Sequence, residues 1–424
     1  MRLRNVATRV VIPTTPVTLL LILTTVFGAW SPAWAAGFAV TAQGGAGIAR
    51  SSAVTAQADD PSALYYNPAG IIQLDQAAGL IGAAVLRPHA DYEPSGAGAA
   101  ATERERYYVL PHLYLTAPIG PRLVAGLGLF SPFGLSTKWL ADWDGRFQVI
   151  DATIRTATIN PALAWRPSAR VAVAGGLQYS VVELSLRRAI DLSSVALPEG
   201  VASLSGEGRA VGFTAGMLVA PSPSWQVGLS FRSRMNAEVR DGWADFTVPA
   251  PAAAMFADAT LRTAVTLPPS LRTGVLVRVT PHWTVEGDAT WTGWSTVDRL
   301  EIRFTNGLAD DITTFRWRDA MTYSLGAEYE VSPTVRLRGG LLYDRSPIPD
   351  QYLNPLIPDA DRRGASLGIG IGSGRWTLDA GYQFLWFERI KNNAVGAASG
   401  AANGRYRSQA HVAGVSAGWR WPTR

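Results

Sequence analysis

The chain has 424 residues, of which 47% are apolar and only 17% are charged, and its formal net charge is +5. An ordinary soluble domain carries about 25% charged residues, so this composition argues against a water-soluble enzyme, and the high apolar content argues against disorder. The absence of cysteine excludes a disulfide framework, a cysteine-ligated zinc site and a cysteine nucleophile.

The N-terminus has the pattern of a secretory signal peptide over residues 1–35. Three arginines precede an apolar run at residues 17–30, and Ala33-Trp34-Ala35 has the small-x-small pattern of a signal peptidase site. The alternative, a retained membrane anchor, is disfavoured because the apolar run is shorter than the roughly 18–20 residues that span a bilayer. We therefore expect an exported chain that begins after Ala35.

Residues 36–77 precede the first predicted strand and have no regular period. They are rich in small residues and end in the stretch DDPSALYYNPAG, in which Asn67-Pro68 predicts a turn. The Asp59-Asp60 pair at the start of this stretch is open to two interpretations, a metal site or an Asx-type cap of the turn, and the turn chemistry favours the cap.

From residue 78 onward the dominant period is two, in segments of about ten residues. In WTVEGDATWTGW, for example, Trp283 and Val285 share one face, and Glu286 and Asp288 share the other. A soluble β-sandwich would need apolar atoms on both inner faces, whereas here one face carries Arg, Glu, Asp and Gly. Five tryptophans lie near turns or the chain end, where an interfacial girdle is expected: Trp165, Trp225, Trp283, Trp376 and Trp421. The pattern therefore predicts a transmembrane β-barrel.

The spacing of turn signals predicts how many strands the barrel has. Six short Pro/Gly turns are expected at 117–122, 166–170, 220–224, 279–283, 331–335 and 372–375. Seven longer polar stretches are expected as loops at 89–104, 131–146, 187–205, 240–260, 298–317, 345–363 and 390–405. Together they predict an all-β fold, a 14-stranded antiparallel transmembrane barrel over residues 78–424, with short periplasmic turns and long external loops.

Fourteen strands enclose a lumen wider than their own side chains fill. Something must block such a lumen, and residues 36–77 are the available segment. We therefore expect them to fold inward as an N-terminal hatch, or plug. The last strand ends at Trp421 with three residues after it, and we expect this end to contact the barrel-insertion machinery.

Several of these stretches resemble the FadL/OmpP-type family of long-chain fatty acid transporters of the outer membrane. The likeness at the hatch rests on Gly37-Phe38, on the Gly-x-Gly of residues 45–47, on Asp59-Asp60 and on Asn67-Pro68-Ala69. In the barrel it rests on residues 267–295, 315–331 and 343–371, the last with its SPIP and IPDADR elements. The resemblance covers essentially the mature chain and is weak across 180–260.

The resemblance implies a hatch-plugged barrel in the outer membrane of a Gram-negative bacterium that carries hydrophobic compounds inward. In the family, a kink in the third strand opens the wall for lateral exit, and Ser131-Pro132-Phe133-Gly134 stand at the matching place. The other interpretation of these residues is the start of an external loop. The resemblance also implies that Arg318 meets the ligand carboxylate, and that Phe38, Asp59, Asp60, Asn67, Pro68 and Ala69 act in the hatch.

The expected partners are hydrophobic small molecules, long-chain fatty acids first, with aromatic or alkane hydrocarbons as the alternative. Outer-membrane lipid and lipopolysaccharide are expected around the barrel, which should be a monomer. No catalytic constellation, phosphate loop or basic nucleic-acid-binding block is present in the sequence, so we expect no enzyme activity, no cofactor, no metal and no nucleic acid. An outer-membrane esterase would need a Ser-His-acid set that the sequence does not show, and an open solute porin would leave residues 36–77 without a purpose.

Overall fold

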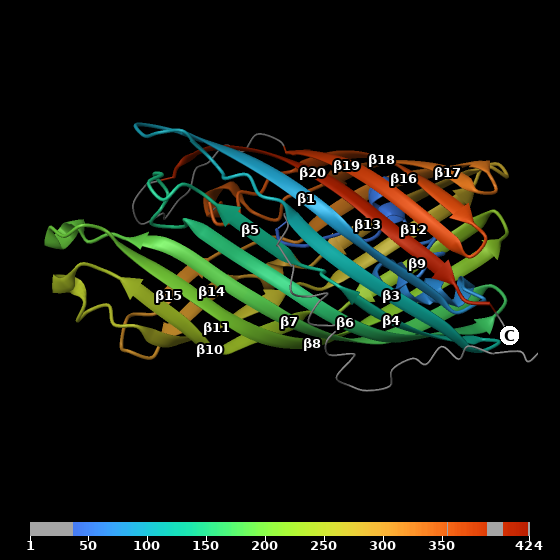
Figure 1. The fold of residues 1–424 in the computed structure, drawn as a ribbon, viewed down its shortest axis with the longest axis horizontal. Helices are drawn as coiled ribbons and strands as arrows, with labels where there is room; N and C mark the ends of the chain where they lie inside the picture. The colour runs from blue at the N-terminus through green and yellow to red at the C-terminus, as the bar shows by residue number, and fades with distance from the viewer. Residues whose placement is uncertain (1–36, 354, 388–401, 423–424) are drawn as a thin grey trace, which may run out of the picture.

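The computed structural model describes residues 37–353, 355–387 and 402–422. The predicted signal peptide, residues 1–35, lies outside the described residues. The described chain forms one closed antiparallel barrel with long strands (Figure 1), which confirms the predicted all-β fold.

The strands of the first half are β1 (Ala78–Pro94), β2 (Ala101–Thr102), β3 (Tyr108–Gly120), β4 (Leu123–Phe130), β5 (Gly134–Lys138), β6 (Asp151–Ser168), β7 (Val171–Ile190), β8 (Gly200–Ser222), β9 (Trp225–Arg232) and β10 (Met235–Thr247). Those of the second half are β11 (Ala259–Leu267), β12 (Ser270–Arg278), β13 (Trp283–Thr292), β14 (Arg299–Phe304), β15 (Asp311–Thr314), β16 (Ala320–Ser332), β17 (Val335–Asp344), β18 (Arg362–Ser373), β19 (Trp376–Phe387) and β20 (Gly404–Arg420). The helices are α2 (Gly45–Ala49), α3 (Ala63–Tyr66), and the short 3₁₀ turns η1 (Pro68–Gln73), η2 (Ser193–Val195), η3 (Ala250–Ala252), η4 (Trp294–Thr296) and η5 (Asp350–Tyr352).

These segments make the 14 strands of the barrel wall in the described chain. Five of these wall strands are interrupted, so that each is described as two segments: β4/β5, β9/β10, β11/β12, β13/β14 and β15/β16. The short β2 pairs beside the outer end of β1. The ring closes where β1 pairs with β20 over its whole length, from Ala78 opposite Arg420 to Pro94 opposite Gly404. Closure leaves no sheet edge that lipid would have to satisfy.

The two faces of the wall follow the predicted alternation. On β13, Glu286 and Asp288 are buried toward the lumen, while Trp283 and Gly287 face outward. The five girdle tryptophans are all exposed, between 44% and 63%, on the outside of the turn end of the barrel: Trp165, Trp225, Trp283, Trp376 and Trp421. An apolar outer face with interfacial aromatics is what a lipid environment favours.

The six predicted short turns lie between strands as expected, whereas the predicted loops are too long, because each of the seven ranges includes residues of a strand. Residues 134–138 are strand β5 rather than loop, so the loop expected at 131–146 begins only after Lys138. Likewise β7 runs to Ile190 and β8 starts at Gly200. These strands have 20 and 23 residues, about twice the 9–11 residues that cross a bilayer. Polar residues beyond the bilayer keep their ladder hydrogen bonds, and a polar composition therefore does not end a strand there.

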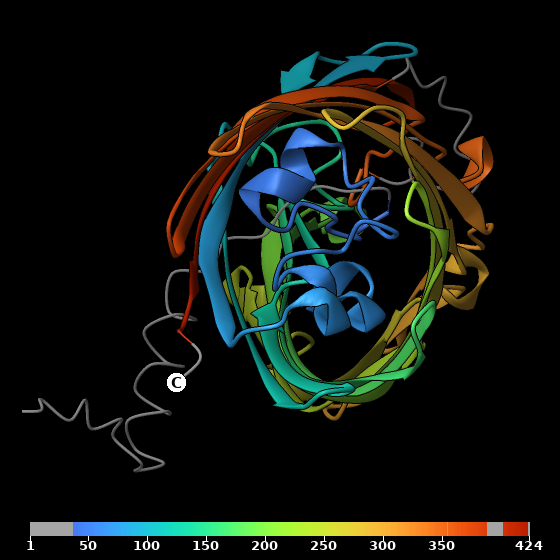
Figure 2. The same cartoon turned by 90° about the vertical axis from the view of Figure 1, so that its right-hand side faces the viewer.

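Residues 37–77 lie inside the ring of strands, where α2, α3 and η1 fill much of the lumen in the view along the barrel (Figure 2). We refer to these residues as the hatch, to residues 37–43 as the strap and to residues 44–77 as the hatch body. Among the residues that the structure describes, no helix is long and apolar enough to cross a membrane.

Candidate functional site

The hatch body is organised around the Asn-Pro-Ala turn. Asn67 caps η1: its side-chain Oδ1 accepts a hydrogen bond from the Ala69 backbone N–H at 3.1 Å, and Pro68 occupies the first position, where it has no N–H to lose. The Asn67 amide nitrogen donates to the backbone oxygens of Thr55 at 2.9 Å and of Met217 in β8 at 3.0 Å. A single fully buried side chain thus joins two parts of the hatch body to the wall.

Asp60 accepts hydrogen bonds from Ser62, from its backbone N–H at 2.7 Å and from its hydroxyl at 2.5 Å. Asp59 accepts from the Gln57 side-chain amide at 3.2 Å. Burial in the lumen raises the pKa of both carboxyl groups. In the described part of the chain, no group of three or more His, Cys, Asp and Glu is placed to hold a metal ion.

Two wall carboxylates bind the backbone of the hatch body. Glu286 accepts hydrogen bonds from the backbone N–H groups of Ala56 at 2.6 Å and Gln57 at 2.8 Å. Asp288 accepts hydrogen bonds from the backbone N–H groups of Val54 and Thr55, both at 3.1 Å. Both carboxylates come from β13, where the period-two pattern turns them inward. We call Glu286 and Asp288 the carboxylate clamp.

Glycines in the wall let the hatch body lie directly on the strands. A Cβ at Gly381 would overlap Gly45 O and Ala49 N, and one at Gly340 would overlap the Arg50 backbone. These positions need glycine because backbone meets backbone there. The hatch body is therefore sealed against β17 and β19 without side chains between them.

The strap is held differently, by backbone pairing with an interrupted strand of the wall. The β3–β4 ladder ends at Leu113 opposite Leu129, and Ser131–Phe133 interrupt the strand before β5 resumes it. We call this interruption the wall break. The strap pairs into it: Val40 N–H donates to Pro132 O at 2.9 Å, Gly134 N–H donates to Phe38 O at 2.8 Å, and Ala39 bridges Phe133.

Phe38 anchors the strap in an aromatic cluster. Its side chain is only 2% exposed, and its ring centroid lies 5.0 Å from that of Trp294, 5.8 Å from that of Phe133 and 5.9 Å from that of Trp317. Trp294 follows β13, and Trp317 precedes β16. An apolar residue near the beginning of the chain is thus buried between the wall break and the opposite wall.

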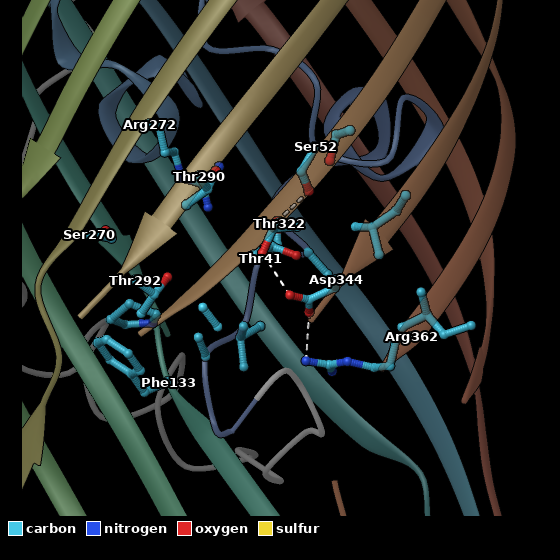
Figure 3. A pocket seen from close by; sticks show the side chains of 18 of the residues that line it. Thr41, Ser52, Phe133, Ser270, Arg272, Thr290, Thr292, Thr322, Asp344 and Arg362 are labelled. Carbon is cyan, nitrogen blue, oxygen red and sulfur yellow. Dashed lines mark hydrogen bonds and ion pairs between the residues drawn. The ribbon is translucent and has the colours of Figure 1, made fainter. Parts of the chain in front are cut away.

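A cavity of about 70 Å³ lies between the strap and the wall, and we call it the inner cavity. Figure 3 shows its polar side, with Arg272, Thr290, Thr322, Asp344 and Arg362 around it. This volume holds a few water molecules and is far below the roughly 300–1,000 Å³ of pockets that enclose drug-sized ligands. A long ligand therefore has to displace part of the lining, and the strap is the part of it that belongs to no barrel strand.

Two of the cations that line the inner cavity are not neutralised. Arg232 and Arg272 have no carboxylate oxygen within 4.0 Å among the described residues. Both guanidinium groups instead stack on Tyr65, with the Arg232 Cζ at 4.7 Å and the Arg272 Cζ at 5.3 Å from the ring centroid. Arg232 also donates to the Tyr65 backbone oxygen at 3.3 Å. A buried charge without a counter-ion is costly, so this pair is suited to an anionic ligand.

The third cation of the inner cavity is already paired. Arg362 donates to the Asp344 carboxylate at 2.7 Å, and the Thr322 hydroxyl donates to the same carboxylate at 2.7 Å (Figure 3). Both ionic side chains are buried, at 2% and 7% exposed. This pair is electrically neutral and leaves Arg232 and Arg272 as the anion-attracting side of the cavity.

Arg318, the carboxylate ligand expected from the sequence, is not among the residues that line the inner cavity. It is exposed in the segment between β15 and β16, where its backbone N–H donates to Pro347 O at 2.9 Å. The sequence reasoning did not single out Arg232 or the role of Arg272. The pairing register contains a sign that both arginines line a polar part of the lumen. Arg232 lies opposite Ser270, and Arg272 lies opposite Thr290.

A second cavity of about 70 Å³, the outer cavity, lies nearer the loop end. Its lining is almost wholly aliphatic and comes from β5 to β8, β10, β11 and β14: Leu135, Ile154, Leu184, Leu186, Leu204, Val239, Leu261, Val265, Leu300 and Ile302, with Leu356 from the loop between β17 and β18. No charged residue lines it. The outer cavity is therefore suited to an alkyl or aryl group.

The loop of residues 345–361 links the outer cavity to the strap. Leu356 lines the outer cavity and its backbone oxygen accepts a hydrogen bond from Thr137 in β5 at 2.8 Å. Asp359, three residues later, accepts from the Gly37 backbone N–H at 3.3 Å and from the Ser346 hydroxyl at 2.8 Å. Burial raises the pKa of the Asp359 carboxyl to about 6.

Comparison with known proteins gives a consistent result. The family model described as outer membrane protein transport protein (OMPP1/FadL/TodX) matches residues 25–421. A putative outer membrane protein of Neisseria meningitidis serogroup B is 25% identical over 86% of this chain and 90% of its own, and a long-chain fatty acid transport protein of Escherichia coli K12 is 24% identical over 85% and 90%.

Solved structures are similar in fold. The crystal structure of a Pseudomonas aeruginosa FadL homologue superposes with a TM-score of 0.82 at 20% identity, covering 91% of this chain and all of that one. A Pseudomonas putida toluene transporter, TodX, superposes with a TM-score of 0.70 at 17% identity, covering 91% of this chain and all of that one.

Proposed function

The chain belongs to the OMPP1/FadL/TodX family of outer membrane transport proteins, and from this premise we propose that it takes up long-chain fatty acids through a gated barrel with lateral exit. The barrel lies in the outer membrane of a Gram-negative bacterium, and its family transports hydrophobic compounds. Transport of this kind requires binding and movement but no chemical step.

The observation that carries the proposal is the double role of the strap. Residues 39–42 line the inner cavity, and residues 38–40 pair with the wall break, so that Ala39 and Val40 do both. A ligand that fills the inner cavity must push the strap aside, and the same movement removes the strap from the break. Ligand binding and wall opening are thereby one event, and the hatch body stays in place. Ser131, Pro132, Phe133 and Gly134 are the proposed exit.

Arg232 and Arg272 favour a carboxylate over a hydrocarbon. A fatty acid head group would neutralise the buried Arg232 and the half-buried Arg272, neither of which has a carboxylate oxygen within 4.0 Å among the described residues, by charge-assisted hydrogen bonds. Toluene or an alkane would leave both cations uncompensated. The relatives include both a long-chain fatty acid transport protein and a toluene transporter, and the cation pair is the feature that inclines the proposal toward fatty acids.

The two cavities and Arg318 define a path from the loop end to the wall. We propose that the exposed Arg318, which lines neither cavity, meets an arriving carboxylate first. The outer cavity, which no charged residue lines, would hold the tail during entry. The head group then moves on to Arg232 and Arg272. Burial of each additional methylene of the tail contributes about 0.8 kcal/mol, which supplies the energy for strap displacement.

Locking the strap into the wall break tests the proposal. Ala39 and Phe133 are a non-hydrogen-bonded antiparallel pair, flanked by the bonds from Val40 to Pro132 and from Gly134 to Phe38. Such pairs have Cα atoms about 4.5 Å apart, within the range that a disulfide spans. The chain has no cysteine of its own, so the double variant Ala39→Cys/Phe133→Cys can form only this bond within one molecule.

We expect the oxidised double variant to assemble normally and to take up no oleate, and uptake to return when dithiothreitol reduces the bond. The single variants Ala39→Cys and Phe133→Cys are the controls for loss of packing. Wild-type rates of oleate uptake by the fully oxidised double variant would show that the strap does not need to leave the break. Unchanged oleate affinity in Arg232→Met/Arg272→Met, with toluene bound equally well, would favour the hydrocarbon alternative.

A further inference from the structure

One wall of the inner cavity is lined by hydroxyl groups, which a simple alkyl chain cannot use. Three neighbouring strands, β12, β13 and β16, contribute them. The set comprises Ser270, Thr290, Thr292, Thr322 and Ser324, which we call the hydroxyl wall. Ser270 lies opposite Thr292, and Thr290 opposite Thr322, so the hydroxyls form a continuous patch beside Arg272 (Figure 3).

Most of these hydroxyls have no protein partner. Thr322 donates to Asp344. For the side-chain hydroxyls of Ser270, Thr290, Thr292 and Ser324, no hydrogen bond is formed with any described residue. They are therefore solvated by whatever occupies the inner cavity. An occupant without hydrogen-bonding groups would strip four hydroxyls of water and return nothing.

Much of the remaining lining is apolar. The strap contributes Ala39, Val40 and Ala42, and β17, β19 and β20 contribute Leu342, Leu385 and Val412. The neutral Arg362–Asp344 pair and Gln383 also belong to this part of the lining. The inner cavity thus has a hydroxyl-rich wall, with Arg272 beside it, and apolar side chains over much of the rest. This distribution of polar and apolar groups fits a ligand that has a carboxylate at one end and a second oxygen-containing group in its chain, rather than a ligand with a uniformly apolar tail.

We propose that the preferred substrates are oxygenated long-chain fatty acids, with a hydroxyl group in the chain that hydrogen-bonds to the hydroxyl wall. This inference rests on the proposed function, because it assumes that a fatty acid carboxylate binds at Arg232 and Arg272. The wall then selects among fatty acids: the hydroxylated chain replaces the water that the wall loses, and the plain chain does not. A net gain of about one hydrogen bond corresponds to roughly tenfold in affinity.

Ricinoleate and oleate provide a matched pair of probes, because both are 18-carbon acids with one cis double bond and ricinoleate adds a single hydroxyl. We expect the full chain in lipid nanodiscs to bind ricinoleate about tenfold more tightly than oleate, as measured by titration calorimetry. The variant Thr290→Val/Thr292→Val keeps the shape of both side chains and removes two hydroxyls. It should lower ricinoleate affinity by about tenfold and raise oleate affinity, reversing or erasing the preference.

Thr273→Val is the matched control, because Thr273 is on β12 as well but faces outward. It should leave the ratio of the two affinities unchanged. Equal affinities of the wild type for the two acids, or a preference that survives in Thr290→Val/Thr292→Val, would overturn the inference and leave the proposed function standing. Failure of the wild type to bind either acid would instead overturn the proposed function itself.

Discussion

The two parts of the hatch are held in the lumen by different forces. The hatch body lies backbone to backbone on wall glycines and is bound by the carboxylate clamp, through four N–H groups at 2.6 to 3.1 Å. The strap has two backbone hydrogen bonds to the wall break, one to Asp359 and the aromatic cluster around Phe38. The Gln43 side chain adds a bond to Ser131 O at 3.0 Å and accepts one from the Tyr114 hydroxyl at 2.9 Å. Among the described residues, the strap rests on no wall glycine of the kind that lets the hatch body lie backbone to backbone on β17 and β19. The difference indicates which part of the plug moves.

This contrast separates sealing from gating. Under the proposed function, the hatch body keeps the barrel closed to ions, since opening it would expose buried carboxyl and backbone groups together. The strap would be displaced by a ligand that replaces its apolar contacts. A gate that opens without unseating the seal would let a wide barrel admit a large hydrophobic molecule and stay closed to small solutes. Four predictions test this division.

The largest effect is expected when the seal is broken. In Gly381→Val the new side chain would overlap Gly45 O and Ala49 N, so the hatch body cannot seat on β19. We expect the barrel to insert and to show steady ion conductance in a planar bilayer, where the wild type shows almost none. Gly287→Val is the control of the same size, because nothing lies within 4 Å of a Cβ there. Silent bilayers for Gly381→Val would mean that the seal does not depend on this contact.

The next largest effect concerns the carboxylate clamp. Glu286→Ala removes the acceptor of two hydrogen bonds from buried backbone N–H groups, and each donor left without a partner costs about 1–3 kcal/mol. We expect the free energy of local opening at Ala56 and Gln57 to fall by about 3 kcal/mol, measured by hydrogen exchange, with strap residues unaffected. Glu207→Ala, which changes an exposed acid on β8, should leave exchange in the hatch as it is. Equal loss of protection in strap and body would contradict their independence.

A smaller effect is expected from loosening the strap. Phe38→Ala deletes a buried ring whose removal from a core costs about 3–5 kcal/mol. If ligand binding requires the strap to leave, part of that energy no longer opposes binding, and the apparent affinity for oleate should rise by about tenfold or more. Conductance should stay low because the hatch body remains sealed. An unchanged affinity would show that the strap is not displaced on binding.

The smallest effect is a pH dependence at Asp359. Its carboxyl has a pKa of about 6 in the closed structure, raised from 3.8 by burial. The closed contact therefore binds the proton more tightly than the open one, and its stabilisation is complete below about pH 4 and is lost as the pH rises through 6. Between pH 5 and 7.5 the strap should open up to about tenfold more readily. Stopped-flow binding of a fluorescent fatty acid measures this.

Asp359→Asn should abolish the dependence, since an amide does not titrate in this range. Asp350→Asn, which alters an exposed acid in the same loop, should retain it. A pH profile that is identical in the wild type and in Asp359→Asn would exclude this carboxyl as the titrating group.

The period of two and the spacing of turns predicted most of the fold. Trp283 and Glu286 lie on opposite faces of one segment, and this polar inner face, together with the tryptophans near the turns, favoured a membrane barrel over a soluble sandwich. Strand ends were predicted less well: Gly134–Lys138 and the ends of β7 and β8 read as loop, since polar residues outside the bilayer still pair. The interpretation of Ser131 as the start of a loop is replaced by an interruption within one wall strand.

The site was less accessible to sequence reasoning. The roles proposed for Phe38, Asn67 and the wall break depend on contacts that the structure describes and that remain to be tested by function. Arg232 and Arg272 were not expected as a pair, because β9 and β12 are separated by β10 and β11 in the chain and meet only as the far ends of two consecutive, interrupted wall strands. Local sequence patterns predict whether a side chain faces the lumen or the lipid. They do not predict which segments pair when a wall strand is interrupted.

The contacts of the hatch also set an order of assembly. Gly45 donates its N–H to Ser416, 371 residues later, and the Gln383 side chain reaches back to Ser51 across 332 residues. The hatch, which is synthesised before all the barrel strands, thus has partners in the last strands to be synthesised. Contacts so distant in sequence make folding slow and leave apolar segments exposed meanwhile. The plug therefore cannot settle until the C-terminal strands are in place, and periplasmic chaperones would have to hold an unfinished barrel until then.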